Sequence, residues 1–165
     1  MSSDPNVRRH FAAYTLATLI AFPVIYLVTE LGEPFLRDRP KATQFPGRAM
    51  AEVITRAWHE RFGTPLVYAG GTEFAVNNLA VYSSDRPHVL PHGSPKLAPW
   101  VDMSDLARRG VVVVWEETHL GARPEEWRET FGPLNIEPIL VLPRQTWNKK
   151  VAPARILYAF VPPRP

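Results

Sequence analysis

The chain has 165 residues, 45% of them hydrophobic and 21% charged, with a formal net charge of +3. This balance excludes a disordered polyelectrolyte, a collagen-like repeat and a polytopic membrane protein. Cysteine is absent, which excludes a disulfide framework, a thiolate nucleophile and a cysteine-based metal site. Proline, at 18 residues, is about twice as frequent as average, and this favours many short elements over a long helical bundle.

The first predicted element is an apolar segment near the amino terminus. Residues 11–28 read FAAYTLATLIAFPVIYLV and carry no charge. A transmembrane helix over 11–31 fits best, because a bilayer core needs about 20 mostly apolar residues and tolerates Pro23 in a helix. A signal sequence fits less well, since the apolar run is too long and no Ala-x-Ala follows it. A core helix is a third interpretation, weakened because the segment is apolar on all faces.

The flanking charges predict an orientation for this helix. Arg8 and Arg9 come directly before it, whereas Arg37 and Arg39 come later and are mixed with acidic residues. The positive-inside rule then places residues 1–10 in the cytoplasm and the rest of the chain outside it. We therefore expect a single-pass protein of the inner membrane with a periplasmic carboxyl-terminal domain.

The remaining chain is predicted to be a proline- and glycine-rich linker at 32–46 and an α/β domain at 47–165. The patterning predicts each element of that domain in chain order. The expected elements are a helix from Gly47 to the C-capping Gly63, a strand at 65–69 closed by a tight glycine turn, a helix at 73–82, a strand at 88–90, a helix from Asp102 or Ser104 to 109, a strand at 111–115, a helix at 124–131, and strands at 136–142 and 154–161.

This alternation predicts a small three-layer α/β sandwich, with a mainly parallel sheet covered by helices on both faces. The link at 144–153 is too short for a helical crossover, so the last strand is expected to be antiparallel and to lie at the edge of the sheet.

Ligands of open parallel sheets bind beyond the carboxyl ends of the strands. The turn Gly70-Gly71-Thr72 leads into a helix amino terminus and could hold an anion. It lacks both dinucleotide and P-loop signatures, and Glu73 would repel a phosphate. A tight turn without a ligand is the simpler interpretation.

Other clusters give weaker signals. His88 and His92 are four apart, but they do not lie on a helix, so no metal site is expected. A strand-end cluster of Glu116, Glu117 and His119 could be a weak acid/base or metal site, although a solvated strand end explains it as well. Ser83 and Ser84 are not in a nucleophile elbow.

The carboxyl-terminal part is basic. Arg144, Lys149, Lys150, Arg155 and Arg164 stand there without an acidic residue, and Trp147 lies among the first of them. Together they could contact anionic lipid headgroups or glycan phosphates, or they could simply form a solvated basic face. Nucleic-acid binding is disfavoured by the low net charge and the absence of a recognition motif.

Several motifs resemble the soluble tail of a family of bacterial membrane glycosyltransferases. They are Trp58 with the run 63–71, Asn77, Tyr82-Ser83 with the run 85–89, Pro99-Trp100-Val101-Asp102, and Gly110 followed by the run 111–115. The family is the dolichyl-phosphate-mannose–protein mannosyltransferase-like group (glycosyltransferase family 39-like), in which many membrane helices precede a small extracytoplasmic α/β domain. The predicted span at 11–31 resembles the last of those helices.

The resemblance implies transfer of a sugar from a polyprenyl-phosphate donor. The family's catalytic carboxylates lie in an extracytoplasmic loop near the start of the membrane domain. That part is not matched here, so no catalytic residue is carried over and the chain alone is expected to be inactive. It implies a role in acceptor or glycan binding, or in covering an active site, beside a polytopic partner in the bilayer. A membrane-anchored interaction module and a small anchored hydrolase are the alternatives. No cofactor or metal is expected, and the candidate ligand contacts are Gly70, Gly71, Thr72, Arg86, His88, Trp100, Trp115 and Glu116.

Overall fold

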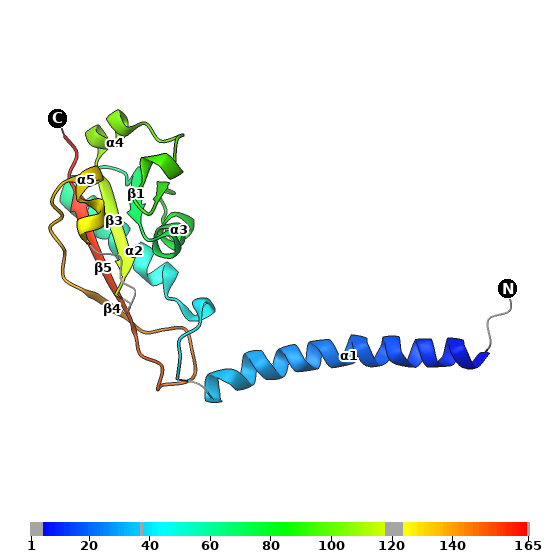
Figure 1. The fold of residues 1–165 in the computed structure, drawn as a ribbon. Helices are drawn as coiled ribbons and strands as arrows, with labels where there is room; N and C mark the ends of the chain where they lie inside the picture. The colour runs from blue at the N-terminus through cyan, green and yellow to red at the C-terminus, as the bar shows by residue number, and fades with distance from the viewer. Residues whose placement is uncertain (1–4, 37, 118–123, 165) are drawn as a thin grey trace. The chain divides into compact units, whose positions relative to one another are not determined.

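The computed structural model describes residues 5–36, 38–117 and 124–164 (Figure 1). The chain divides into two compact units. One consists of residues 1–40 together with 146–152, and the other of residues 41–145 together with 153–165. Each unit is described separately below.

The first unit is dominated by one helix, α1 (Pro5–Leu36). Its segment Pro5–Glu30 contains an 18-residue window with a mean hydropathy of 2.0, none of which is buried, so this helix is long and apolar enough to cross a membrane. The hydroxyls of Thr15 and Thr18 donate to the carbonyls of Phe11 and Tyr14, each at 2.9 Å, which satisfies them within the helix. Such internal satisfaction is what a hydrocarbon environment requires.

The helix is longer than the predicted 11–31 and continues into the expected linker. Extending an existing helix carries no new nucleation cost, and α1 continues past Gly32 and Pro34 to Leu36 although Pro34 has no N–H to donate. The rest of the linker contains a short 3₁₀ turn, η1 (Ala42–Gln44). Residues 32–36 of the predicted linker are therefore helical.

The second unit begins at Lys41 and so contains η1. Its first long element is α2 (Gly47–Phe62), which is capped at the predicted Gly63, in the left-handed conformation. The elements that follow are β1 (Tyr68–Gly71), α3 (Glu73–Tyr82), β2 (His88–Pro91), η2 (Pro95–Leu97), α4 (Met103–Arg109), β3 (Val111–Glu116), η3 (Pro124–Trp127), α5 (Arg128–Phe131), β4 (Leu140–Leu142) and β5 (Ala154–Val161). The helix expected over 124–131 is thus a 3₁₀ turn continued by one α-helical turn.

The five strands form one sheet in the order β2-β1-β3-β5-β4. β1 pairs in parallel with β2 and β3, whereas β5 is antiparallel to both of its neighbours. The mainly parallel sheet was therefore predicted correctly. The last strand is antiparallel as expected, but it is internal, and β4 forms the edge.

The strand predicted at 136–142 is mostly irregular. Only Leu140–Leu142 pair as a strand, and Ile136 makes a single bridge to Ala159. Pro138 lies between them and has no N–H to donate to a ladder, which explains the interruption.

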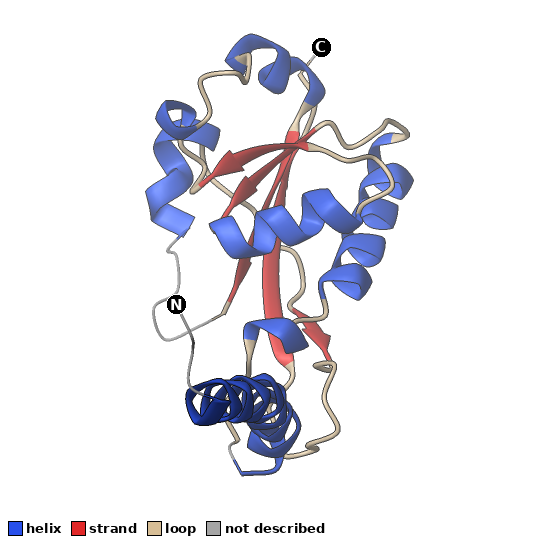
Figure 2. Ribbon diagram, turned by 90° about the vertical axis from the view of Figure 1, so that its right-hand side faces the viewer, coloured by secondary structure: helices blue, strands red, loops and turns tan. Residues whose placement is uncertain are grey.

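The sheet lies between two layers of helices, as Figure 2 shows, and it separates two apolar clusters. Alternate side chains of the strands point to opposite faces. One face packs against α2 and α3, through Met50, Ile54, Trp58, Val76 and Leu79 among others. The opposite face is covered by α4, η3 and α5, through Val101, Leu106, Trp127 and Phe131. These layers confirm the predicted three-layer sandwich.

The two glycines of β1 belong to the strand and not to a tight turn, which corrects the prediction. A Cβ at Gly70 would lie 2.9 Å from Phe131 Cζ, and one at Gly71 would lie 1.9 Å from the carbonyl oxygen of Val114. Gly71 also has a φ of +129°, which side chains rarely tolerate. Close packing of β1 against β3 and α5 therefore explains why glycine stands at both positions.

Candidate functional site

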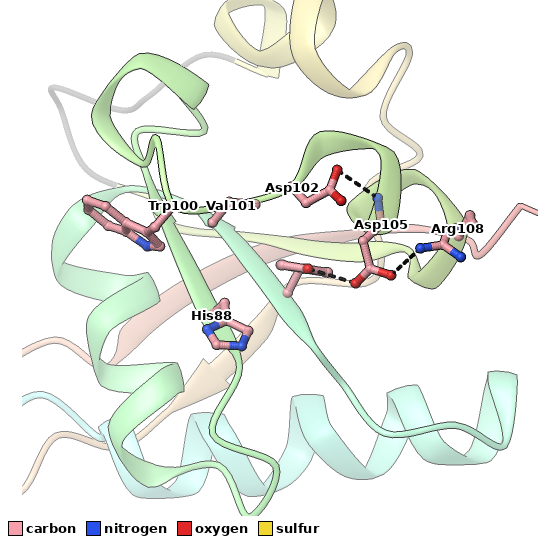
Figure 3. A pocket seen from close by; sticks show the side chains of 7 residues that line it. His88, Trp100, Val101, Asp102, Asp105 and Arg108 are labelled. Carbon is pink, nitrogen blue, oxygen red and sulfur yellow. Dashed lines mark hydrogen bonds and ion pairs between the residues drawn. The ribbon is translucent and has the colours of Figure 1, made fainter.

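A hollow of about 390 Å³ lies where β1, β2 and the start of α4 meet. It is lined by Tyr68, His88, Trp100, Val101, Asp102, Asp105 and Arg108 (Figure 3). Tyr68 and His88 are register partners at the amino-terminal ends of their parallel strands. The hollow therefore lies away from the carboxyl edge where the sequence suggested a site.

The amino terminus of α4 positions the polar groups of this pocket. Asp102 is the N-cap, and its Oδ1 accepts hydrogen bonds from the amides of Ser104 at 2.8 Å and Asp105 at 3.3 Å. Capping fixes the start of the helix, so Asp105 and Arg108 follow on the same face at a spacing of three residues. Trp100 comes just before the cap and is 69% exposed.

Asp105 is the centre of a hydrogen-bonded group. The Tyr68 hydroxyl donates to its Oδ2 at 2.8 Å, and Arg108 Nη2 lies 2.8 Å from its Oδ1. Arg109 Nε lies 3.0 Å from Oδ2. The phenol of Tyr68 is thereby held against α4.

These contacts keep both carboxylates of the pocket ionised. The hydrogen bond from Tyr68, helped by Arg109 and Arg108, lowers the pKa of Asp105. Hydrogen bonds from the Ser104 hydroxyl and from the amides of Ser104 and Asp105 lower the pKa of Asp102. Burial and the bond to Asp105 raise the pKa of Tyr68, so its hydroxyl stays protonated and able to donate.

Two of the eight predicted contact residues, His88 and Trp100, line this pocket. The His88 ring lies 5.8 Å from the Tyr68 ring, centroid to centroid. Gly70, Gly71 and Thr72 do not line it. The Thr72 amide donates to the Val114 carbonyl at 3.1 Å, so this backbone donor is already used by the sheet.

The other three predicted contacts also lie elsewhere. Trp115 is 2% exposed and packs on Trp127 at 5.2 Å between ring centroids, so its ring belongs to the core. Glu116 is paired with Arg144, whose side chain is 9% exposed. Arg86 lies in the turn before β2, with a φ of +51°.

The remaining predicted clusters are not assembled into a site. His92 lies 3.7 Å from Glu73 and not beside His88, and Glu117 is paired with Arg155. His119 lies outside the described residues. Within the described part of the chain, no group of His, Asp or Glu could hold a metal ion.

A larger hollow of about 480 Å³ lies beside α2 and includes His59, Thr55 and Ser84. His59 Nε2 lies 2.6 Å from Asp85 Oδ2, which also accepts from the Leu66 amide at 2.6 Å. Burial opposes ionisation of Asp85, but the bonds from Leu66 and His59 outweigh it and lower its pKa. Asp85 therefore ties α2 to the start of β1, and we assign this group a structural role.

Tyr68, Asp105 and Arg108 are pocket residues that the sequence did not indicate. Tyr68 reads as one more apolar residue of a buried strand, and the other two read as the polar face of a short helix. The one available signal was a tryptophan two residues before an N-capping aspartate. Comparisons with protein-family models, curated proteins and solved structures gave no match.

Proposed function

We propose that this chain is a membrane-anchored accessory domain whose pocket binds the glycan acceptor of an extracytoplasmic glycosyltransferase that uses a polyprenyl-phosphate-linked sugar. One observation carries the proposal. The exposed ring of Trp100 and the ionised carboxylates of Asp102 and Asp105 line the same hollow.

Sugars combine apolar C–H faces with arrays of hydroxyl groups. An exposed indole ring offers a flat apolar surface for such a face, with little conformational entropy to lose. Carboxylates accept strong, charge-assisted hydrogen bonds from neighbouring hydroxyls. The volume of about 390 Å³ falls in the range of about 300–1,000 Å³ that is usual for ligand pockets.

The charges of the pocket favour a neutral glycan over the phosphorylated donor. Asp102 and Asp105 face it with two negative charges, and Arg108 is already paired with Asp105. A donor phosphate placed here would be repelled by these carboxylates, and the paired Arg108 would compensate only in part. Acceptor binding is therefore the more favourable assignment of this pocket.

The same carboxylates favour binding over cleavage. A glycosidase needs one carboxyl group with a raised pKa to act as general acid. Both pocket aspartates have a lowered pKa, so neither can donate a proton near neutral pH. In this proposal the catalytic groups come from a polytopic glycosyltransferase partner in the same bilayer.

The proposed location follows from α1. Its apolar length supports a span across the inner membrane, and Arg8 and Arg9 at its start support a cytoplasmic amino terminus. The α/β domain is then periplasmic, on the side where lipid-linked sugars would be transferred.

The test is a binding titration of the full chain in lipid nanodiscs. A panel of neutral mannose- and glucose-containing oligosaccharides is titrated by calorimetry, with the matching sugar phosphates as a second panel. We expect a neutral oligosaccharide to bind, and Trp100→Ala to weaken it at least about tenfold.

Trp147→Ala is the matched control, because Trp147 is also exposed, at 79%, but does not line the pocket. We expect this variant to bind like the unmodified chain. The proposal fails if no neutral oligosaccharide binds, if only sugar phosphates bind, or if both tryptophan variants lose affinity equally.

A further inference from the structure

A short basic turn, Thr146–Ala152, belongs to the same compact unit as α1. It comes between β4 and β5 in sequence, yet it clusters with residues 1–40 and not with the sheet. Figure 1 draws it in orange beside the carboxyl-terminal end of α1. Parts of the chain more than 100 positions apart are thus joined in one unit.

The turn presents an aromatic ring and two cations outward. Trp147 is 79% exposed, and Lys149 and Lys150 are exposed as well. The backbone is held by bonds from the Asn148 amide to the Thr146 hydroxyl at 3.2 Å and from the Lys150 amide to the Asn148 side chain at 2.9 Å. Val151 is buried, so an apolar residue anchors the turn while the ring and the cations face solvent.

The length of α1 indicates where its carboxyl-terminal end lies relative to the bilayer. The uncharged residues 11–28 span about 27 Å at 1.5 Å per residue, close to the hydrocarbon thickness of about 30 Å. Leu36 lies eight residues further, about 12 Å along the axis. The headgroup layer adds about 5–8 Å on each side of the hydrocarbon, so the end of an upright α1 lies a few ångströms outside that layer.

We propose that the basic turn binds the membrane interface, with Trp147 at the headgroup level and Lys149 and Lys150 on the phosphates of anionic lipids. Tryptophan is enriched at this level because its ring is apolar and its N–H is polar. Lysines near a membrane are attracted by anionic headgroups. No acidic residue occurs in residues 138–165, so no carboxylate of that segment opposes the attraction.

The test measures the environment of Trp147 in proteoliposomes that contain the full chain. Vesicles of phosphatidylcholine, with or without phosphatidylglycerol, carry a phosphatidylcholine brominated near the headgroup, which quenches nearby tryptophans. The contribution of Trp147 is the difference between the unmodified chain and Trp147→Phe. Trp100→Phe is the matched control, because Trp100 is exposed but lies in the second unit.

We expect Trp147→Phe to remove a lipid-quenched component that Trp100→Phe leaves in place. Phosphatidylglycerol should increase that component, and Lys149→Gln with Lys150→Gln should abolish the increase. The expected change in occupancy of the lipid-bound turn is about fivefold for each lysine.

The inference is overturned if brominated lipid does not quench Trp147. It is also overturned if quenching is the same with and without phosphatidylglycerol. Sugar binding at Trp100 is measured separately, so the failure of one proposal does not affect the test of the other.

Discussion

Replacing Gly71 by alanine tests the close packing of β1 against β3. The new Cβ would lie 1.9 Å from the carbonyl oxygen of Val114, an atom of the neighbouring strand that cannot rotate away. That same oxygen accepts the Thr72 amide at 3.1 Å. The substitution therefore combines a backbone clash, an unfavourable φ of +129° and a weakened hydrogen bond.

The magnitudes of these effects can be added approximately. Strain at such a φ costs about 1–3 kcal/mol, overpacking about 1–3 kcal/mol, and the hydrogen bond about 1 kcal/mol. The total of about 3–7 kcal/mol is a large part of a typical unfolding free energy of about 5–15 kcal/mol. We expect Gly71→Ala to be severely destabilised or unfolded.

Gly63→Ala is the matched control. Gly63 has a φ of +65°, but nothing lies within 4 Å of a Cβ there, so only left-handed strain of about 1–2 kcal/mol remains. Urea unfolding of the full chain in detergent, followed by tryptophan fluorescence, compares the two variants. For a slope of about 2 kcal/mol per molar urea, Gly63→Ala should lower the midpoint by about 1 M or less, and Gly71→Ala by about 1.5 M or more. Equal shifts would refute the close-packing argument.

Three other predictions concern Asp85, Arg144 and membrane topology. Asp85→Asn should lower the free energy of unfolding by about 1–3 kcal/mol at pH 7, because the hydrogen bonds from Leu66 and His59 are weakened. The folded pKa of Asp85 is lowered, so its stabilisation is present above about pH 4 and is lost as the pH falls through the folded value. Unfolding midpoints at pH 7 and pH 3 should differ less in this variant, and an unchanged difference would contradict its role. Arg144→Met should lower the free energy of unfolding by about 2–3 kcal/mol, because it leaves the half-buried Glu116 without its cation. Adding Glu116→Gln should recover part of that loss in the same assay. No recovery would contradict the pairing. A reporter that is active only in the periplasm should be active when fused after Arg164. An inactive reporter would contradict the predicted orientation of α1.

The helices and the parallel strands could be predicted because their signals are local. The stripe of Met50, Ile54 and Trp58, and the run of valines in β3, need no knowledge of distant residues. Gly70 and Gly71 were misinterpreted because a glycine doublet after an apolar run is typical of a turn. The reason for these glycines lies in Phe131 and Val114, which are far away in sequence.

The candidate pocket was only partly predictable for the same reason. His88 and Trp100 stood out as polar or aromatic residues in motifs, whereas Asp105 joins them only through its bond to Tyr68. That bond exists because β1 and α4 meet across 37 positions of sequence. Trp115 looked like a ligand contact in the sequence, but its ring is buried under η3 and α5, on the face of the sheet that α4 also covers.

The place of β5 between β3 and β4 affects how the chain can fold during synthesis. β3 has no neighbour on that side, and β4 has none at all, until residues 154–161 have left the ribosome. Until then the nascent domain exposes the edges of β3 and β4 that β5 will pair, which favours aggregation. We infer that the domain completes its fold only after translation of β5, so truncation within 154–161 is far more harmful than an extension beyond it.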